Sequence, residues 1–328
     1  LANFSRRPLD PVRVAVLDAA SGAALATFEG EALERRFDRS GLQWQAKAGA
    51  PIEPGRRGIV FFELALPAGA PAPGALLHRV DYRVTEGEGE TARVEGARVP
   101  VAREAAMVIG PPLRGGPWIA IHDPSWERGH RRVVYAIDGK ARTPGRFAVD
   151  WVKLDAHGRK SHRDHGLTAD AYSHGEDVLA VADGTVMSVR DDLPERRRLD
   201  ERSDHTLDTG SGNAIALDLG NGRFAFYGHL RPGSARVVPG DRVRKGQKIA
   251  EVGFTGSASD PQLHFNLADQ PAAVGSEGLP FALDRFRSLG TYARIDDVGA
   301  SPWRPRDGGE EDRVRELPAG NSVVMFED

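Results

Sequence analysis

Cysteine is absent from this chain of 328 residues. Without a thiol the protein has no cysteine nucleophile, no disulfide framework and no cysteine-ligated zinc, so a bound metal must use histidine and carboxylate ligands. A cytosolic protein can lack cysteine by chance, but the absence also suits an oxidising compartment, where a stray thiol would mispair. Metal or acid–base chemistry is therefore to be sought among the histidines and acidic residues.

A membrane-spanning run and an excess of positive charge are also absent. No apolar stretch of the sequence approaches the roughly 18 residues that a membrane span needs. The 44 basic residues are balanced by 47 acidic ones, so the overall charge does not favour nucleic acid or an anionic membrane surface as a partner. The chain opens Leu1-Ala2-Asn3, without a methionine or a charged leader, which predicts a processed or trimmed product.

Glycine and proline, in contrast, are frequent, with 38 and 22 residues respectively. Between them lie short segments with apolar residues at every second position, for example residues 12–16, 58–66 and 78–84. This alternation is typical of strands with one buried face, and no long stretch has helical periodicity. The sequence therefore predicts a mostly β fold.

The length favours two domains, because single cores rarely grow beyond about 250–300 residues. We expect a β-sandwich domain of immunoglobulin-like size at residues 1–108 and a linker rich in glycine and proline at residues 109–117. A second β-rich domain follows at residues 118–286. The tail, residues 287–328, contains an apolar segment at 322–326 that could dock back on the body as a strand.

Six short pieces between residues 178 and 267 carry the strongest signal. They are residues 178–186, 212–218, 226–230, 239–250, 252–257 and 261–265, which read VLAVADGTV, GNAIALD, FYGHL, PGDRVRKGQKIA, VGFTGS and PQLHF. In order and spacing this set resembles the lysostaphin/LytM-type zinc metallopeptidases of the M23 kind. The resemblance implies a lysostaphin-like antiparallel sheet or open barrel for residues 118–286.

The resemblance also implies a metal site and a reaction. In the family, zinc is held by the His and Asp of a His-x-x-x-Asp strand and by the second His of a His-x-His strand. Side chains two and four positions apart on a strand share one face, so these spacings direct the ligands into one groove. The first His of His-x-His and a further His that follows a Tyr handle the proton and stabilise the tetrahedral intermediate. The zinc cofactor polarises the peptide carbonyl and activates water.

The positions of this chain match the family pattern only in part. His264 takes the zinc-binding position of the His-x-His strand. Gln262 takes the first position, where a glutamine can form hydrogen bonds but cannot act as a base near neutral pH. His229 follows the pair Tyr227-Gly228 and matches the auxiliary histidine. The resemblance therefore implies His264 at the metal, with His229 and Gln262 at the catalytic positions.

The His-x-x-x-Asp strand has two candidate registers. In the first, Asp150 is the carboxylate ligand and Arg146 stands where the family has histidine. In the second, His165 and Asp170 are both kept, but the segment is one residue too long. The extra residue turns the two side chains to opposite faces unless a bulge intervenes. We favour Asp150 because residues 146–150 match the strand pattern better.

The first register leaves two questions open. An acid within an apolar strand needs a partner, and the partner of Asp150 is either a metal or Arg146, four residues away on the same face. His264, between two apolar neighbours, is either a ligand or a hydrogen-bonded core histidine. If Asp150 is a ligand, a histidine of the inserted loop could supply the missing imidazole. The candidates are His162, His165 and His174.

The resemblance implies two competing functions. The first is an exported zinc metalloendopeptidase that cleaves peptidoglycan stem or cross-link peptides, impaired by the changes at Arg146 and Gln262. The second is a catalytically inactive relative that binds peptidoglycan or regulates another cell-wall enzyme. Loss of a general base costs about 10²–10⁴-fold in rate, and loss of one of three zinc ligands should remove most of the metal affinity. Either function places the protein in the periplasm or outside the cell, in agreement with the absence of cysteine. A third hypothesis is a purely structural role in which the N-terminal sandwich mediates contacts.

Overall fold

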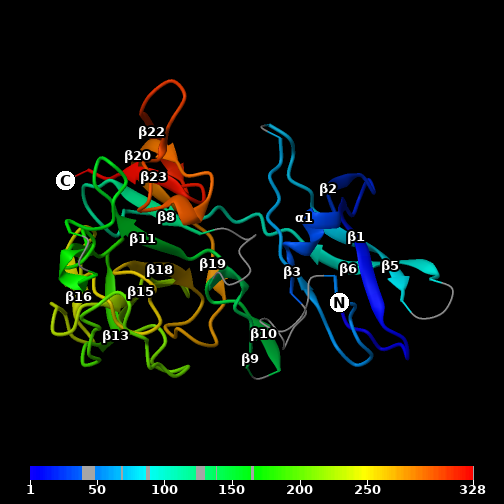
Figure 1. The fold of residues 1–328 in the computed structure, drawn as a ribbon, viewed down its shortest axis with the longest axis horizontal. Coiled ribbons are helices and arrows are strands. Elements are labelled where there is room, and N and C mark those ends of the chain that lie inside the picture. The colour runs from blue at the N-terminus through cyan, green and yellow to red at the C-terminus, as the bar shows by residue number, and fades with distance from the viewer. Residues whose placement is uncertain are drawn as a thin grey trace. The chain divides into compact units, whose positions relative to one another are not determined.

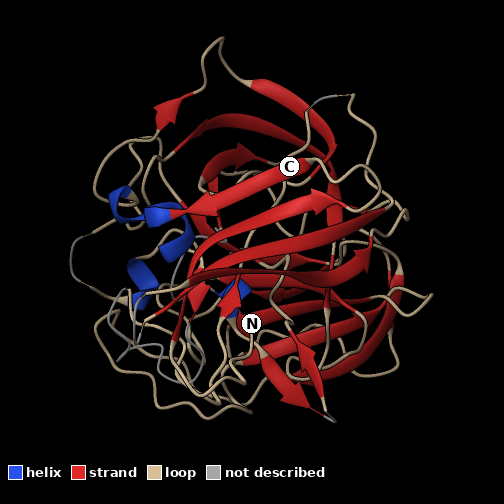
Figure 2. Cartoon of the chain, turned by 90° about the vertical axis from the view of Figure 1, so that its right-hand side faces the viewer, coloured by secondary structure: helices blue, strands red, loops and turns tan. Residues whose placement is uncertain are grey.

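The computed structural model describes residues 1–38, 49–67, 69–85, 89–122, 130–137, 139–163 and 166–327 (Figure 1). The chain divides into two compact units. Unit 1 comprises Leu1–Ala105 and Pro124–Arg132, and unit 2 comprises Ala106–Asp123 and Val133–Asp328. Strands dominate, and the helices in the described residues are short (Figure 2). The mostly β fold predicted from the alternation of apolar residues is confirmed.

Unit 1 is built on an antiparallel sheet with the strand order β2-β1-β5-β6. Helix α1 contributes Leu33, and β4 contributes Val60, to a small core with Val14 and Val80 of the sheet. The second layer in the described residues consists of these short elements, so the immunoglobulin-like sandwich itself stays a prediction. The elements are β1 (Leu9–Asp18), β2 (Ala24–Glu29), α1 (Gly30–Glu34), β3 (Phe37–Asp38), β4 (Ile59–Val60), β5 (Ala75–Val84) and β6 (Thr91–Pro100).

Unit 2 contains a large mixed sheet in which most strands pair antiparallel. Its main path has the order β16-β13-β14-β15-β18-β11-β8-β23-β20-β21, with β19, β22 and β7 paired to its members. The strands are β7 (Met107–Ile109), β8 (Trp118–Ile121), β11 (Val149–Lys153), β13 (Gly184–Arg190), β14 (Asn213–Asp218), β15 (Phe224–Leu230), β16 (Arg242–Val243), β18 (Leu263–Ala268), β19 (Gly278–Leu279), β20 (Phe281–Thr291), β21 (Arg304–Pro305), β22 (Glu311–Glu316) and β23 (Ser322–Met325).

Shorter elements complete unit 2. Two further strand pairs are β9 (Tyr135–Ile137) with β10 (Lys140–Arg142) and β12 (Asp177–Leu179) with β17 (Lys248–Glu251). Two 3-10 helices, η2 (Thr168–Asp170) and η3 (Ile295–Asp297), lie in loops; a third, η1 (His130–Arg132), belongs to unit 1. No helix in the described part of the chain has the length and hydropathy needed to cross a membrane.

The main core of unit 2 lies on one face of its central strands, and a smaller buried cluster that includes Ile119 and Val152 lies on the other. Val149 pairs with Phe265 and Trp151 pairs with Leu263 across β11 and β18, and all four side chains are fully buried. Trp151 also packs edge-on against Phe326, with ring centroids 5.3 Å apart. Because side chains alternate along a strand, the residues between these positions point to the opposite face.

The segments next to the second domain pack into unit 2. Part of the sequence expected to be a linker is buried, because Leu113 is fully enclosed in the core, and β7 just before it pairs in parallel with β20. The apolar segment expected to dock at the C-terminal end forms β23, which pairs with β8 on one side and with β20 on the other. The domain boundaries themselves stay a prediction.

Candidate metal centre

The register between β11 and β18 places Asp150 directly opposite His264. The two side chains lie on the face opposite the main core, and His264 Nδ1 is 2.7 Å from Asp150 Oδ1. They are neither fully buried nor freely exposed, with 14% of the Asp150 side chain and 18% of the His264 side chain accessible. An imidazole and a carboxylate from neighbouring strands therefore share one small volume of the unit 2 surface.

The next strand, β15, places a glycine beside this pair. Gly228 lies opposite His264, and a Cβ at Gly228 would be 3.1 Å from the main-chain oxygen of Ser211 and 3.5 Å from the His264 Cβ. The first distance is tight and the second is an ordinary van der Waals contact, so the backbone near Ser211 is what a side chain here would press against. The following residue, His229, brings its ring to within 5.9 Å of the His264 ring, measured between centroids.

His229 is held as a neutral imidazole with a defined tautomer. Its Nδ1 is 2.9 Å from the main-chain oxygen of Thr255. Because a carbonyl oxygen only accepts hydrogen bonds, Nδ1 carries the proton and Nε2 presents a lone pair. Burial lowers the pKa of His229 to about 4, with a further lowering from the nearby His264 and a partial opposite effect from Asp150. The ring is therefore uncharged at neutral pH.

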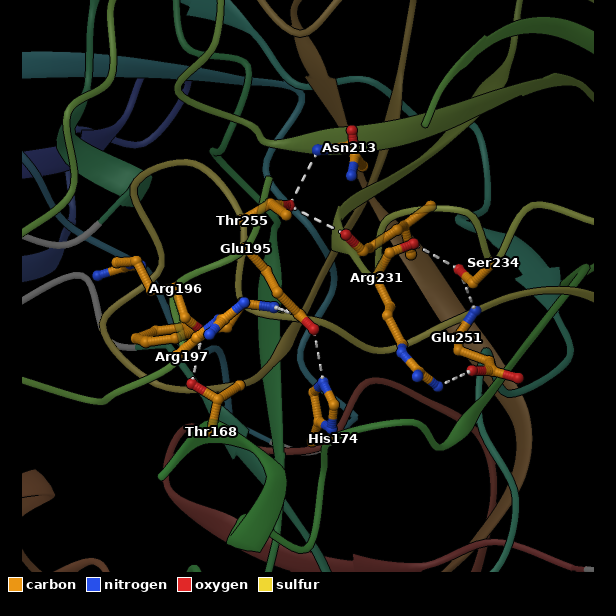
Figure 3. A network of polar contacts seen from close by, with 12 residues as sticks. Thr168, His174, Glu195, Arg196, Arg197, Asn213, Arg231, Ser234, Glu251 and Thr255 are labelled. Carbon is orange, nitrogen blue, oxygen red and sulfur yellow. Dashed lines mark hydrogen bonds and ion pairs between the residues drawn. The ribbon is translucent and has the colours of Figure 1, made fainter. Parts of the chain in front are cut away.

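The loop that holds His229 is itself fixed by the side chain of Thr255. The hydroxyl of Thr255 donates to the Leu230 oxygen at 3.0 Å and accepts from the Asn213 main-chain nitrogen at 2.9 Å (Figure 3). Gly212 permits this approach, since a Cβ there would lie 2.3 Å from the Thr255 hydroxyl oxygen. The main-chain oxygen that orients His229 thus belongs to a tightly packed segment.

Glu195 also holds the loop at residues 254–256 in place. It accepts from the Phe254 main-chain nitrogen at 3.2 Å and lies 3.0 Å from His174 Nε2 (Figure 3). The guanidinium of Arg196 stacks over the Phe254 ring at 3.7 Å. His174, one of the histidines considered as a substitute metal ligand, is consequently engaged with Glu195.

A cavity of about 300 Å³ adjoins this loop. Its wall includes Phe254 and Gly256 together with polar residues of the 193–209 segment, among them Arg202, His205 and Thr209. The cavity and His229 therefore share one loop, residues 254–256. A peptide bound in the cavity would lie beside the segment that orients this histidine.

Gln262 lies two residues before His264 and is buried, with 6% of its surface accessible. Its main-chain nitrogen donates to the Gly253 oxygen at 3.3 Å, in an isolated bridge next to the 254–256 loop. Residues two apart on a strand share a face, so the amide belongs on the side of the Asp150–His264 pair. A glutamine there offers one donor and one acceptor group but no titratable nitrogen.

The second register is not assembled in the same way. Asp170 ends the 3-10 helix η2, and one of its carboxylate oxygens is buried without a hydrogen-bond partner in the described residues. Within this part of the chain no hydrogen bond or ion pair joins Asp170 to Asp150 or His264. His165 lies outside the described residues. His162 packs against Tyr172, with ring centroids 4.1 Å apart and the ring planes tilted by 55°.

Arg146 does not take Asp150 as its partner. Its side chain is 57% exposed and forms an ion pair with Glu277 at 3.2 Å. The family histidine position is thus occupied by a group directed to a surface acid. Two residues important to this site, Thr255 and Glu195, were not singled out from the sequence. Thr255 lies in the noted glycine-rich segment, but nothing in the pattern marks Glu195.

Comparison with known proteins confirms the resemblance for the central part of unit 2. Residues 163–275 match the family model described as Peptidase family M23. The matched range contains Asp170, His229, Gln262 and His264, whereas Asp150 lies before it. The matched range thus includes the carboxylate of the second register, whereas the direct contact with His264 is made by Asp150.

Two curated relatives are similar over about a third of the chain. The murein hydrolase activator EnvC of Escherichia coli K12 is 33% identical over 105 residues, which is 32% of this chain and 21% of EnvC. The cell division protein DipM of Caulobacter vibrioides is 28% identical over 109 residues, which is 33% of this chain and 15% of DipM. The matches thus span about a fifth or less of the relatives' own lengths.

Solved structures of M23 proteins are also similar to this chain. A catalytic-domain mutant of the prophage-encoded M23 protein EnpA from Enterococcus faecalis has 21% identity, covering 52% of this chain and 92% of that chain, with a TM-score of 0.30. The catalytic domain of lysostaphin from Staphylococcus simulans has 18% identity, covering 52% and 88%, with a TM-score of 0.27.

Proposed function

Starting from the M23 match, we propose that this chain is an exported bacterial cell-wall protein that holds zinc and acts on peptidoglycan peptides as a weakened endopeptidase. The observation that carries the proposal is the contact between Asp150 and His264, 2.7 Å apart on the open face of paired strands. Both groups come from the positions that the sequence pattern suggested for ligands. A periplasmic or extracellular location also agrees with the lack of cysteine.

The pair supplies two of the three protein ligands that a catalytic zinc takes. Zinc in proteins takes imidazole nitrogen and carboxylate oxygen as ligands, and Asp150 with His264 offers one of each. Held by these two residues, zinc would polarise the peptide carbonyl and make a bound water more acidic. A partly accessible pair suits a catalytic site better than a closed structural one, because substrate and water must reach it.

The protein groups around the pair would transfer the proton and orient the water. His229 presents its Nε2 lone pair because Nδ1 donates to Thr255, so it can accept a proton from the attacking water. The protonated ring can then donate to the oxyanion of the tetrahedral intermediate. Gln262 can orient the water by hydrogen bonding but cannot take its proton, which leaves the site weaker than one with histidine there.

A second function is favoured by specific observations. Gln262 lacks basicity, and Arg146, at the family histidine position, pairs with Glu277 instead of offering a ligand. One curated relative is called a murein hydrolase activator. On this alternative, the face of unit 2 that carries Asp150 and His264 binds peptidoglycan peptides or another cell-wall enzyme without cutting.

Metal content tests the proposed site. Protein purified without chelator should retain about one equivalent of zinc, and Asp150→Asn or His264→Ala should release most of it, since each removes a ligand. Asp170→Asn is the matched control, because it changes the competing carboxylate and should keep the zinc. Replacing the other histidines one at a time would identify further ligands. If Asp170→Asn, and not Asp150→Asn, empties the site, the second register is correct.

Cleavage of purified peptidoglycan sacculi separates the two functions. We expect slow release of peptide-linked fragments by the wild type, and a gain of about 10²-fold or more with Gln262→His, because a base would be restored beside His264. Gln262→Asn, which restores no base, is the control. Zinc retained without any cleavage by either protein would leave the binding or regulatory function, which binding to intact sacculi would then measure.

A further inference from the structure

One aromatic side chain of unit 1 is exposed to solvent. It is far in the sequence from the residues of the proposed metal centre. Phe4 is 93% exposed, the highest value among the large apolar residues in the described part of the chain. A single exposed apolar residue is ordinary on a protein surface. The chain beside Phe4 is held in place by polar contacts of Asn3 and Ser5.

Asn3 fixes the loop that carries Phe4. Its side chain is 1% exposed, and its amide nitrogen donates to the Arg7 oxygen at 2.9 Å and to the Ile52 oxygen at 2.7 Å. Its amide oxygen accepts from the main-chain nitrogen of Ser5 at 2.9 Å and from the Ser5 hydroxyl at 2.7 Å. These hydrogen bonds of Asn3 join residues on both sides of Phe4, so the loop has less backbone freedom to lose on binding.

A second loop brings more positive charge to the same place. The Asn3 main-chain nitrogen donates to the Arg56 oxygen at 2.9 Å, and Gly55 donates to the Asn3 oxygen at 2.8 Å. The loops thereby join the pairs Arg6-Arg7 and Arg56-Arg57, and all four arginine side chains are exposed. Among the described residues, the acids beside them include Glu53, which is exposed, and Glu90, which lies 3.9 Å from Arg7. In this part of the chain, four arginines therefore stand against these two acids near Phe4.

We propose that this patch, formed by Phe4, Arg6, Arg7, Arg56 and Arg57, docks unit 1 on an anionic lipid bilayer. Guanidinium groups pair with lipid phosphates in a fork geometry. A phenyl ring on a projecting loop can enter the boundary between headgroups and acyl chains, where apolar side chains of peripheral proteins are buried. The patch thus combines the two signals, charge and one apolar anchor, that reversible attachment to a bilayer uses.

A bilayer fits this surface better than a folded acidic protein. A projecting ring needs a pocket of its own shape in a protein partner, whereas lipid rearranges around it. Arginines on two loops around the ring can each find a phosphate in a fluid layer without matching a fixed pattern. The inference does not depend on the metal centre of unit 2 and holds for an active enzyme or a binding module alike.

Vesicle sedimentation with the full chain tests the proposal. We expect binding to vesicles of phosphatidylglycerol and phosphatidylcholine, little binding to phosphatidylcholine alone, and weakening at high salt because exposed charges are screened. Arg6→Gln and Arg56→Gln should each lower the partition coefficient about fivefold, the effect of one basic residue near an anionic surface. Phe4→Ser should lower it about tenfold through loss of apolar burial. In Phe4→Trp, the added fluorescence should be quenched by brominated lipid.

Matched controls keep the result specific. Arg98→Gln changes an exposed arginine elsewhere on unit 1, and Leu207→Ala changes a residue of unit 2 that is 61% exposed. Both should bind vesicles like the wild type. Equal binding to neutral and anionic vesicles, an equal loss with Arg98→Gln, or no effect of Phe4→Ser would overturn the proposal. So would a wild type that ignores vesicles while Phe4→Ser abolishes capture of a protein partner.

Discussion

Asp155 fixes the turn that follows the strand carrying Asp150. Its carboxylate accepts from the main-chain nitrogens of His157 and Arg159, each at 2.9 Å, and from the Arg159 guanidinium at 2.7 Å. Burial raises the pKa of Asp155, but these hydrogen bonds outweigh it and lower the pKa to about 2. The ionised carboxylate is therefore part of the folded turn.

The stability of this turn should depend on pH. A carboxyl whose pKa falls from 3.8 to about 2 on folding contributes stability above pH 3.8, and the contribution is lost as the pH falls towards about 2. Asp155→Asn should lower the melting temperature at pH 7 by roughly 2–4 °C, the shift that about 1 kcal/mol causes in a domain of this size. The gap to wild type should narrow from pH 4 downwards. A gap that stays constant across that range in urea or thermal unfolding would show that the charge of Asp155 is not the cause.

The sequence identifies residues of the site better than it identifies their supports. Asp150 and His264 could be proposed because period-two spacing fixes which side chains share a face once the strands are known. Thr255 and Glu195 could not, since they act through main-chain groups of loops far away in the sequence. Arg146 was a candidate partner of Asp150 by spacing alone, but Glu277, from another segment, takes it instead.

At the scale of the element, the end of β15 departs from regular strand geometry. His229 has φ of 62°, in the left-handed region that side chains with a Cβ rarely adopt. The pairing between β14 and β15 also shifts register between Asn213 and Ile215. This irregular end turns the His229 ring to the Thr255 oxygen, so the backbone strain is tied to the position of a functional side chain.

Paired substitutions at His229 should show this strain. Both His229→Ala and His229→Gly remove the ring, but glycine adopts φ of 62° without a steric penalty. We expect His229→Gly to be more stable than His229→Ala by about 1 kcal/mol in urea unfolding. The opposite sign is expected for Ala225→Gly in the regular part of β15. Equal stabilities of the two His229 variants would argue against strain at this position.

Strand positions were predictable from alternation, but their neighbours were not. The sequence indicates a strand at residues 146–150 and another that carries His264. In the structure β11 begins only at Val149, because residues 144–147 form a turn, so Arg146 is not placed on the face of Asp150 by strand spacing. Nothing local in the sequence places β11 between β18 and β8. The family match starts at residue 163 and leaves β11 out. Its partner in the sheet is chosen by long-range packing, above all by Trp151 and Phe265 in the core. A short stretch of sequence does not indicate tertiary packing of this kind.

At the scale of the whole molecule, a nearly balanced number of acidic and basic residues conceals a local cluster of positive charge. The net charge of −3 gives no reason to expect an anionic partner. The arginine patch of unit 1 becomes visible only when residues 3–7 and 53–57 are hydrogen-bonded to each other. Electrostatic attraction acts over about one Debye length, so this local arrangement decides what that surface attracts, and the total charge does not.

The position of β23 in the sheet affects how the protein folds during its synthesis. β8, from the start of unit 2, has β11 on one side and β23 on the other, so one edge of it waits for residues 322–325. On the ribosome, β8 emerges long before that partner has been translated. Until then the edge of β8 that faces away from β11 is an open template for wrong pairing. We therefore expect this half of the chain to mature late and slowly, and to depend during synthesis or export on factors that keep the unfinished sheet covered.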